Sequence, residues 1–494
     1  MKRPSSYRLG LLAFSLTMES GCANLQSLHL AHPSVAPATQ PTASLKVDAS
    51  QIAPMYHRLL AIDMPTVVRV ANSRNLDIQQ ARQRLEMSRG RYESSVAAIF
   101  PVVAPSITGL HVQGANQNAN GTLAFANFTD FIPGISINWI LNPGQVAYDI
   151  IAAKRRLEAA DQMEQAVIQE TTRVAAVQFY DLVLAQAQVS VTRQATEEAA
   201  ELLRIERLRL HAGTGVPADE LRAEAALANV QQDLITALNA FYEASISLAV
   251  TLHLDAATML VPETGAMQQT ALVRDGLSMV EMVAAATRYR PDLEAVRKLL
   301  QASQADKGAA IWGELGPQFQ ASYSFAGLAA HTTGQDGALN ARQQEAGTAG
   351  FALGASTYGQ LNTATANRNS ASLNVEARLD QIRATLVSAH QASIAAAKLI
   401  PIAAQQVNAA DETLRLTQEN LQAGTGLTVD VLQAEDAADR ARYRYAMAIV
   451  RYNQSEVNLL AALGLIDQNS LLTSAPTSPP APESSRPPGR ERQR

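Results

Sequence analysis

The chain has a single cysteine and few aromatic residues. Cys22 is the only cysteine among 494 residues, so no disulfide can form within one chain. Phenylalanine, tryptophan and tyrosine together make up only 5% of the sequence, whereas alanine is abundant. Small side chains with few rings suit closely packed helices better than a thick globular core. The composition therefore favours helices that pack side by side.

The chain also lacks an excess of positive charge and long hydrophobic runs. Its 40 lysines and arginines are outnumbered by 45 aspartates and glutamates, giving a net charge of -5, so it lacks the basic footprint of a nucleic-acid-binding protein. After the N-terminus no run of 18 or more residues is uninterruptedly apolar, and we therefore expect no transmembrane helix. Strands of a membrane β-barrel remain possible, because alternating strands give a much weaker hydropathy signal.

Signatures of catalysis and of metal or nucleotide binding are absent from the sequence. It contains no HExxH zinc motif, no G-x-S-x-G nucleophile motif and no G-x-x-x-x-G-K-[ST] phosphate loop. None of its 8 histidines lies four residues from another. We therefore expect no enzymatic activity, no catalytic residues, no metal site and no cofactor apart from a covalent lipid.

The N-terminus resembles a bacterial lipoprotein signal. Basic residues precede an apolar run at residues 9–18, and small residues lead into Cys22, which is the layout of a cleaved secretory signal. We expect residues 1–21 to be the signal peptide and Cys22 to carry a lipid of the palmitate type. Glu19 departs from the pattern, which has an apolar residue at this position. The alternative is an unmodified cysteine inside the signal.

Two stretches of biased composition flank a long central region. Residues 22–55 are rich in alanine, proline, serine, glutamine and threonine, which predicts an extended, lipid-anchored linker. Residues 467–494 form a proline-rich polar tail in which we expect no packed structure. We divide the region between them into two structural repeats, residues 56–262 and residues 263–466.

One phrase that occurs twice marks the repeats. LHAGTGVPADELRAE begins at Leu210 and LQAGTGLTVDVLQAE begins at Leu421, with nine of fifteen positions identical at a constant offset of 211. A second pair, LDIQQAR from Leu76 and PDLEAVR from Pro291, is offset by 215. Self-similarity at a nearly fixed spacing indicates an internal duplication.

Each copy of the phrase lies between long helical segments. Residues 145–212 contain neither glycine nor proline, and a continuous helix of that length would span ~100 Å. Residues 218–261 are again free of both residue types and have apolar residues at heptad spacing, as in coiled coils. The matching segment of the second half, residues 360–423, is interrupted by Pro401, which predicts a kink.

Alternating sequences precede each pair of helices. Apolar and polar residues alternate at residues 135–141 and 318–325, which predicts strands with one apolar and one polar face. We expect residues 101–112 and 351–355 to be their weaker partner strands. The polar segments between the strands of each pair, expected to be long loops, are residues 113–130 and 327–350.

The order of these elements and the duplicated phrase resemble those of the TolC/OprM family of outer-membrane efflux factors. Each half is expected to run helix, strand, strand, long helix, glycine turn and long helix, and both halves contain LxAGTGxxxDxLxAE. The resemblance covers residues 56–466 and implies a mainly α fold with a small β part. In that fold long α-helical hairpins form a trimeric α-barrel tunnel, and three chains each give four strands to a shared twelve-stranded membrane β-barrel.

The resemblance implies the function of a passive conduit. The chain would be the outer-membrane channel of a tripartite efflux pump for drugs or other small molecules, lipid-anchored in the bacterial outer membrane and extending into the periplasm. Its implied partners are two further copies in a homotrimer, a periplasmic adaptor protein, an inner-membrane pump and outer-membrane lipid, but no nucleic acid. Two alternatives remain open: an outer-membrane channel for type I secretion, and a periplasmic coiled-coil scaffold without a channel.

The resemblance also assigns roles to the residues of the two turns. Asp219 and Asp430 would constrict the closed periplasmic aperture, and the glycine turns would dock onto the adaptor. From the residues alone, one glycine of each turn supplies a positive φ, the threonine caps a helix, and the aspartates sit at the positive end of a helix dipole. The expected docking residues are Gly213, Thr214, Gly215, Gly424, Thr425 and Gly426.

Three residues depart from the TolC pattern near the second turn. Leu421, Gly426 and Gln433 stand where TolC has a tyrosine, an arginine and a second aspartate that hold its aperture closed. The closed state of this chain is therefore expected to be held differently, by apolar contact.

Overall fold

The computed structural model describes residues 58–471, except residues 118–119, 256, 264–266, 275, 333–334, 337–339, 352–353, 355 and 468. The expected signal peptide at residues 1–21, the lipid site at Cys22, the linker to residue 55 and nearly all of the tail lie outside the described residues.

The described residues contain the same series of elements twice. The first half comprises β1 (Arg58–Ile62), α1 (Met64–Arg74), α2 (Leu76–Ala97), β2 (Val102–Gln117), β3 (Leu123–Leu141), α3 (Pro143–His211) and α4 (Pro217–Thr251). The second half comprises β4 (Thr258–Pro262), α5 (Met279–Tyr289), α6 (Pro291–Leu315), β5 (Gln318–Thr332), β6 (Gln335–Asp336), β7 (Asn340–Gly350), α7 (Thr357–Gln422) and α8 (Thr428–Ala462). The mainly helical fold with a small β part is therefore confirmed.

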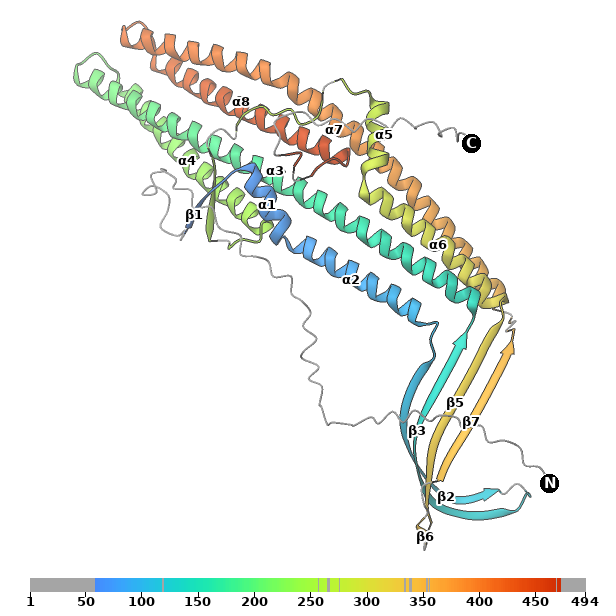
Figure 1. The fold of residues 1–494 in the computed structure, drawn as a ribbon. Coiled ribbons are helices and arrows are strands. Elements are labelled where there is room, and N and C mark those ends of the chain that lie inside the picture. The colour runs from blue at the N-terminus through green and yellow to red at the C-terminus, as the bar shows by residue number, and fades with distance from the viewer. Residues whose placement is uncertain are drawn as a thin grey trace, which may run out of the picture. The chain divides into compact units, whose positions relative to one another are not determined.

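Two very long helices run through the structure. The helix α3 has 69 residues and α7 has 66, so each is about 100 Å long at 1.5 Å per residue. Pro401 lies inside α7 without ending it. Figure 1 shows that α7 bends part-way along, whereas α3 is nearly straight. A proline inside a helix removes one backbone hydrogen bond and crowds the preceding turn, which accounts for a bend in one copy only.

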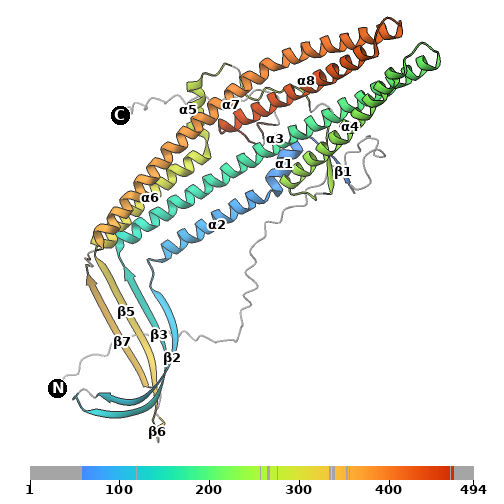
Figure 2. The same cartoon turned by 180° about the vertical axis from the view of Figure 1, so that it is seen from behind.

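The strands at one end of the long helices form an antiparallel sheet, which both views show (Figures 1 and 2). The sheet runs β2, β3, β5, β7, and the short β6 also pairs with β5. Among the described residues, β2 pairs only with β3 and β7 only with β5, so each presents a free edge. Such an edge exposes unpaired backbone groups that another strand can satisfy.

Two expectations about these strands are wrong. The fourth long strand is β7, not residues 351–355, and β2 extends five residues beyond residue 112. The polar segments at residues 113–130 and 327–350 are consequently strand for most of their described length rather than long loops. Apolar alternation is weak in β7 because both of its faces carry glutamine, glycine and alanine.

The sheet nevertheless has one apolar face across three strands. Ile135 of β3 lies opposite Phe325 of β5, and Ile137 lies opposite Tyr323. The neighbouring positions of β2 on the same face are Pro105, opposite Ile135, and Val103, opposite Ile137. The alternate positions carry serine, asparagine and glutamine, as the alternation in the sequence predicts.

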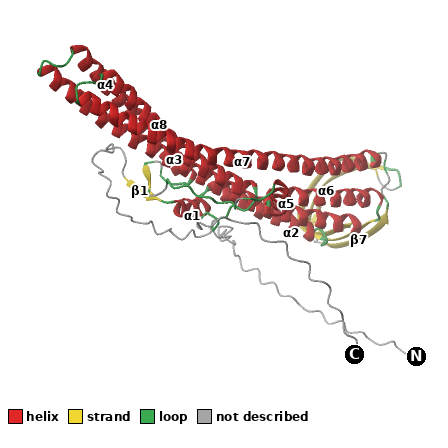
Figure 3. Cartoon of the chain, turned by 90° about the horizontal axis from the view of Figure 1, so that it is seen from above, coloured by secondary structure: helices red, strands yellow, loops and turns green. Residues whose placement is uncertain are grey.

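Pairs of shorter helices meet end to end beside α3. The side-chain amide of Asn75, at the start of α2, donates to the carbonyl oxygen of Thr251 at the end of α4 over 2.9 Å. The guanidinium of Arg290, which precedes α6, donates to the carbonyl oxygen of Ala462 at the end of α8 over 3.3 Å. Figure 3 shows these helices running along the long ones. The two copies thus use the same joint, with the donors offset by 215 and the acceptors by 211.

Strands β1 and β4 pair in parallel close to these joints. Neither strand was expected from the sequence, and the breaker-free segment at residues 218–261 is not one helix, since α4 ends at Thr251 and β4 follows. A five-residue strand is too short to show a period against the helical pattern that surrounds it.

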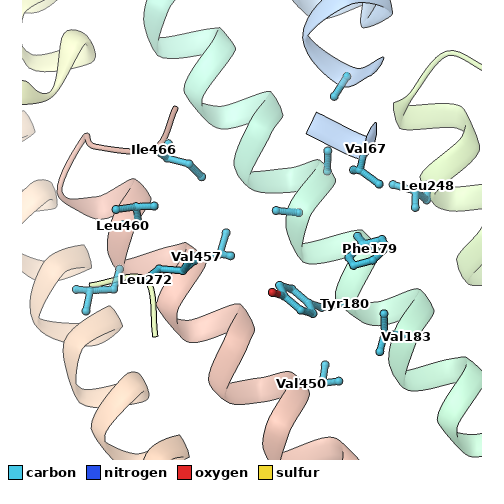
Figure 4. Packing of buried hydrophobic residues seen from close by; sticks show 14 of the residues in the cluster. Val67, Phe179, Tyr180, Val183, Leu248, Leu272, Val450, Val457, Leu460 and Ile466 are labelled. Atoms are coloured by element: carbon cyan, nitrogen blue, oxygen red, sulfur yellow. The ribbon is translucent and has the colours of Figure 1, made fainter. Parts of the chain in front are cut away.

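The largest core cluster of the described residues joins α3 to helices of both repeats. In Figure 4, Tyr180 points from α3 toward Val450 and Val457 of α8, while Phe179 points toward Val67 of α1 and Leu248 of α4. All of these side chains are buried. The two hairpins are therefore held together by apolar packing on α3.

Three described helices contain a window that could cross a membrane by length and composition alone. They are Pro143–His211, Pro217–Thr251 and Thr357–Gln422. The expectation that no helix could do so counted only uninterrupted apolar runs, whereas these windows include scattered polar residues.

Candidate functional site

The turns that end the two long helices have the same hydrogen bonds. In the first turn the carbonyl oxygen of Arg209 accepts the backbone N–H of Thr214 at 3.0 Å and of Gly215 at 2.9 Å. In the second, Asn420 accepts the corresponding two N–H groups at the same distances. The duplicated phrase therefore encodes one backbone structure, in which the last carbonyls of a helix are satisfied by the residues that reverse it.

Both glycines of each turn are required, for different reasons. Gly213 and Gly424 have φ values of 73° and 78°, a region that residues with a Cβ rarely occupy. Gly215 and Gly426 do not have positive φ, but a Cβ on them would lie 2.7 and 2.8 Å from backbone nitrogen of the incoming helix. The turn therefore excludes side chains at both positions.

The threonines do not cap the outgoing helices. The hydroxyls of Thr214 and Thr425 each donate to the carbonyl oxygen five residues earlier, over 3.2 Å. The N-cap residues are Val216 and Leu427, and neither makes a side-chain cap hydrogen bond. The threonines thus finish the incoming helix, and an exposed apolar side chain begins the next.

The two predicted aperture residues differ in their surroundings. Asp219 and Asp430 both lie in the first turn of their helices, as expected. Asp219 accepts from Arg222 Nη1 at 2.7 Å. Asp430 is exposed and pairs with no described cation. Within one copy of the chain, only Asp430 presents an uncompensated carboxylate at its turn.

Leu421 lies inside the chain rather than on its surface. It is 3% exposed and belongs to a second core cluster that joins all four helices behind the turns. Leu202 of α3, Ala223 of α4 and Val431 of α8 belong to the same cluster. Gln433 is exposed. Leu421 therefore makes apolar contacts within one chain.

A buried carboxylate links the two turns. Glu206 of α3 is 1% exposed, and it accepts from the hydroxyl of Thr428 at 3.0 Å and from Arg209 Nη1 at 3.0 Å. Thr428 is the first residue of α8. Removal of either partner would leave buried polar atoms unsatisfied, so this contact fixes the start of α8 against the end of α3.

Further from the turns, one arginine bridges three helices. Arg442 of α8 lies 2.9 Å from Asp411 of α7, 3.3 Å from Glu198 of α3 and 3.3 Å from Asp439 of its own helix. Glu435, which lies one turn before Asp439 on α8, is buried. One buried oxygen of Glu198 has no described partner. Three carboxylates thus contact a single guanidinium, and a fourth, Glu435, lies beside them.

The excess of acid changes the proton affinity of this cluster. Burial, and then the negative charges of Glu198 and Asp439, raise the pKa of Glu435 to about 7. Burial, and then Glu198, raise the pKa of Asp439 to about 6. In the described part of the chain, no three His, Cys, Asp or Glu side chains are placed to hold a metal ion.

Sequence reasoning found the turns but missed these two charged contacts. The turn residues recur in both copies, whereas Glu206, Thr428 and Arg442 each act across helices that are far apart in sequence. The only sequence signal for these contacts was the presence of charged residues within helical segments whose other positions follow a heptad-like pattern.

Comparison with known proteins accounts for this architecture. Residues 67–252 match the family model described as outer membrane efflux protein. The match covers most of the first repeat, which is therefore similar to outer membrane efflux proteins. A search of curated proteins found no relative similar in sequence.

Solved structures extend the likeness beyond the matched residues. The CmeC outer membrane channel of Campylobacter jejuni is 17% identical with a TM-score of 0.70, over 82% of this chain and 87% of that one. The outer membrane protein VceC of Vibrio cholerae is 17% identical with a TM-score of 0.67, over 81% and 96%. The MtrE outer membrane channel of Neisseria gonorrhoeae, in its open state, is 18% identical with a TM-score of 0.66, over 81% and 89%. The chain therefore has the fold of these channels along most of its length.

Proposed function

We propose that the chain is the outer-membrane channel of a tripartite efflux pump, a passive conduit for drugs or other small molecules that catalyses no reaction. The observation that supports this most is the sheet, which has an apolar face and two free edges and continues into helices about 100 Å long. A sheet with free edges cannot lie in lipid until every backbone group is paired. Three copies that join β2 to β7 would close it into a barrel above a helical tunnel.

In this proposal the two glycine turns face the inner membrane and dock onto a periplasmic adaptor, which connects the channel to an inner-membrane pump. Val216 and Leu427 support such docking, because they are 56% and 64% exposed at equivalent positions of the two turns. Exposed apolar side chains at the same place in both copies offer a repeated contact for one partner.

We propose an outer-membrane location with a lipid on Cys22, which follows the signal-like run of the sequence. Incorporation of radioactive palmitate into the wild type, and none into a Cys22→Ala variant, is the expected result. Equal labelling of both would rule out this anchor.

The channel itself is tested by purification and electrical recording. Protein extracted from outer membranes should be a trimer and should give stepwise conductance in planar bilayers. A soluble monomer without conductance would favour the scaffold alternative.

The two aspartates provide a matched test of the aperture. Asp430→Ala should raise conductance and passive antibiotic leakage, since it removes the uncompensated carboxylate at the tip. Asp219→Ala serves as its control, because Arg222 already neutralises that side chain. Equal permeability in the two variants would argue against a gating role for Asp430.

A further inference from the structure

Two adjoining cavities form a groove between α3 and α7. Their volumes are about 610 and 700 Å³, and they share Glu170, Arg290 and Ala461 as lining residues. The end of α8 and the start of α6 line the groove between the two long helices. We call this feature the arginine groove, after Arg173, Arg290, Arg378 and Arg451, which line it.

Positive charge exceeds negative charge in the arginine groove. Its acidic lining residues are Glu170 and Asp292. Glu170 is held by Arg173 at 2.6 Å, and Asp292 by Arg290 at 2.6 Å and by Arg378. Arg451 is exposed and has no hydrogen bond or ion pair to a described residue. Four guanidiniums against two carboxylates leave two positive charges uncompensated.

The walls beside these charges are apolar. From α7, Ala392, Ala396 and Leu399 line the part of the groove that contains Arg451. From α3, Met163 and Val167 line the other part. A guanidinium forms a planar pair of hydrogen bonds with sulfonate, phosphate or carboxylate, while the apolar walls gain from covering a hydrocarbon group.

We propose that the arginine groove binds small amphiphilic anions, with the acidic group at Arg451 and the hydrocarbon part along the alanine-rich face of α7. Cavities of this volume match those that enclose drug-sized ligands.

The test compares three ligands with the same alkyl chain: octanesulfonate, octanol and octyltrimethylammonium. Binding is measured by calorimetry on the full chain in zwitterionic lipid nanodiscs, with empty nanodiscs as the blank. We expect the sulfonate to bind most tightly. Loss of one charge-assisted hydrogen bond costs roughly a factor of ten in affinity, so Arg451→Gln should weaken sulfonate binding about tenfold and leave octanol within about twofold.

Two further variants make the result specific. Arg451→Lys keeps the charge and should retain most of the sulfonate affinity. Arg444→Gln removes an exposed charge from the same helix outside the cavities and should have little effect. The proposal fails if octanol binds as tightly as the sulfonate, or if Arg444→Gln weakens binding as much as Arg451→Gln. This outcome is independent of conductance, so it can fail while the channel function holds.

Discussion

Replacement of Glu435 by glutamine should stabilise α8 against local unfolding at high pH but not at low pH. Glu435 is 8% exposed in a cluster with three other carboxylates and one arginine. Burial raises its pKa to about 7 in the folded protein, from the ordinary glutamate value of 4.5. That difference corresponds to roughly 3 kcal/mol, at 1.36 kcal/mol for each tenfold change in proton affinity.

The sign follows from the raised pKa. Below pH 4.5 the side chain is protonated in both states, so its burial carries no electrostatic penalty. As the pH rises through about 7 the folded protein must accept a buried negative charge, and stability is lost. Glutamine has nearly the same shape and never ionises, so the variant escapes this loss. Asp439 retains its own raised pKa, so some pH dependence remains.

Hydrogen exchange of α8 amides in the intact protein measures this effect, after correction for the intrinsic pH dependence of exchange. At pH 4, below the ordinary glutamate pKa, the wild type and Glu435→Gln should be nearly equally protected. At pH 8 the variant should be more protected by up to about a hundredfold, the factor that corresponds to roughly 3 kcal/mol. Glu419→Gln is the control, because Glu419 is 60% exposed. The same protection in the wild type and Glu435→Gln at pH 8 would refute the argument.

Two further substitutions test contacts elsewhere in the fold. Glu456 is buried and accepts the backbone N–H groups of Leu272 and Val273 at 3.0 Å and the hydroxyl of Ser393 at 2.6 Å; Glu456→Ala strands these donors and should cost about 3–5 kcal/mol, seen as a lower apparent Tm, and an unchanged Tm would contradict it. His253 ends α4 with φ of 51°, so His253→Gly should raise stability by about 0.5–1 kcal/mol, and a lower Tm would show that the imidazole has a role of its own.

The duplication made the helical part of the fold predictable. The expected segment at residues 145–212 is α3 to within two residues at either end, and the one at 360–423 is α7 to within three. Long segments without glycine or proline have few alternatives to a helix. The glycine turns were predictable for the same reason, since a phrase that recurs between two helices has one local structure to encode.

The strands and the joints between helices were less predictable. β7 has polar residues on both faces, so its sequence shows no alternation and the register comes from its pairing with β5. The end of α4 was hidden because His253 occupies the left-handed position that Gly464 occupies at the matching place in the second copy. An offset of 211 aligns these two residues. Comparison of the copies at that offset would have located the end of the helix.

The charges at the two turns differ although the turns share one sequence motif. Both turns have the same backbone hydrogen bonds, yet the first aspartate is neutralised by Arg222 and the second is not. Position 433, where the second copy has glutamine, corresponds to Arg222 at the offset of 211, so the second turn has no equivalent cation. A ring of such turns would otherwise present two equal acids per chain. Because only Asp430 remains uncompensated, the proposed trimer carries three such carboxylates at its tip rather than six, one on each α7–α8 hairpin.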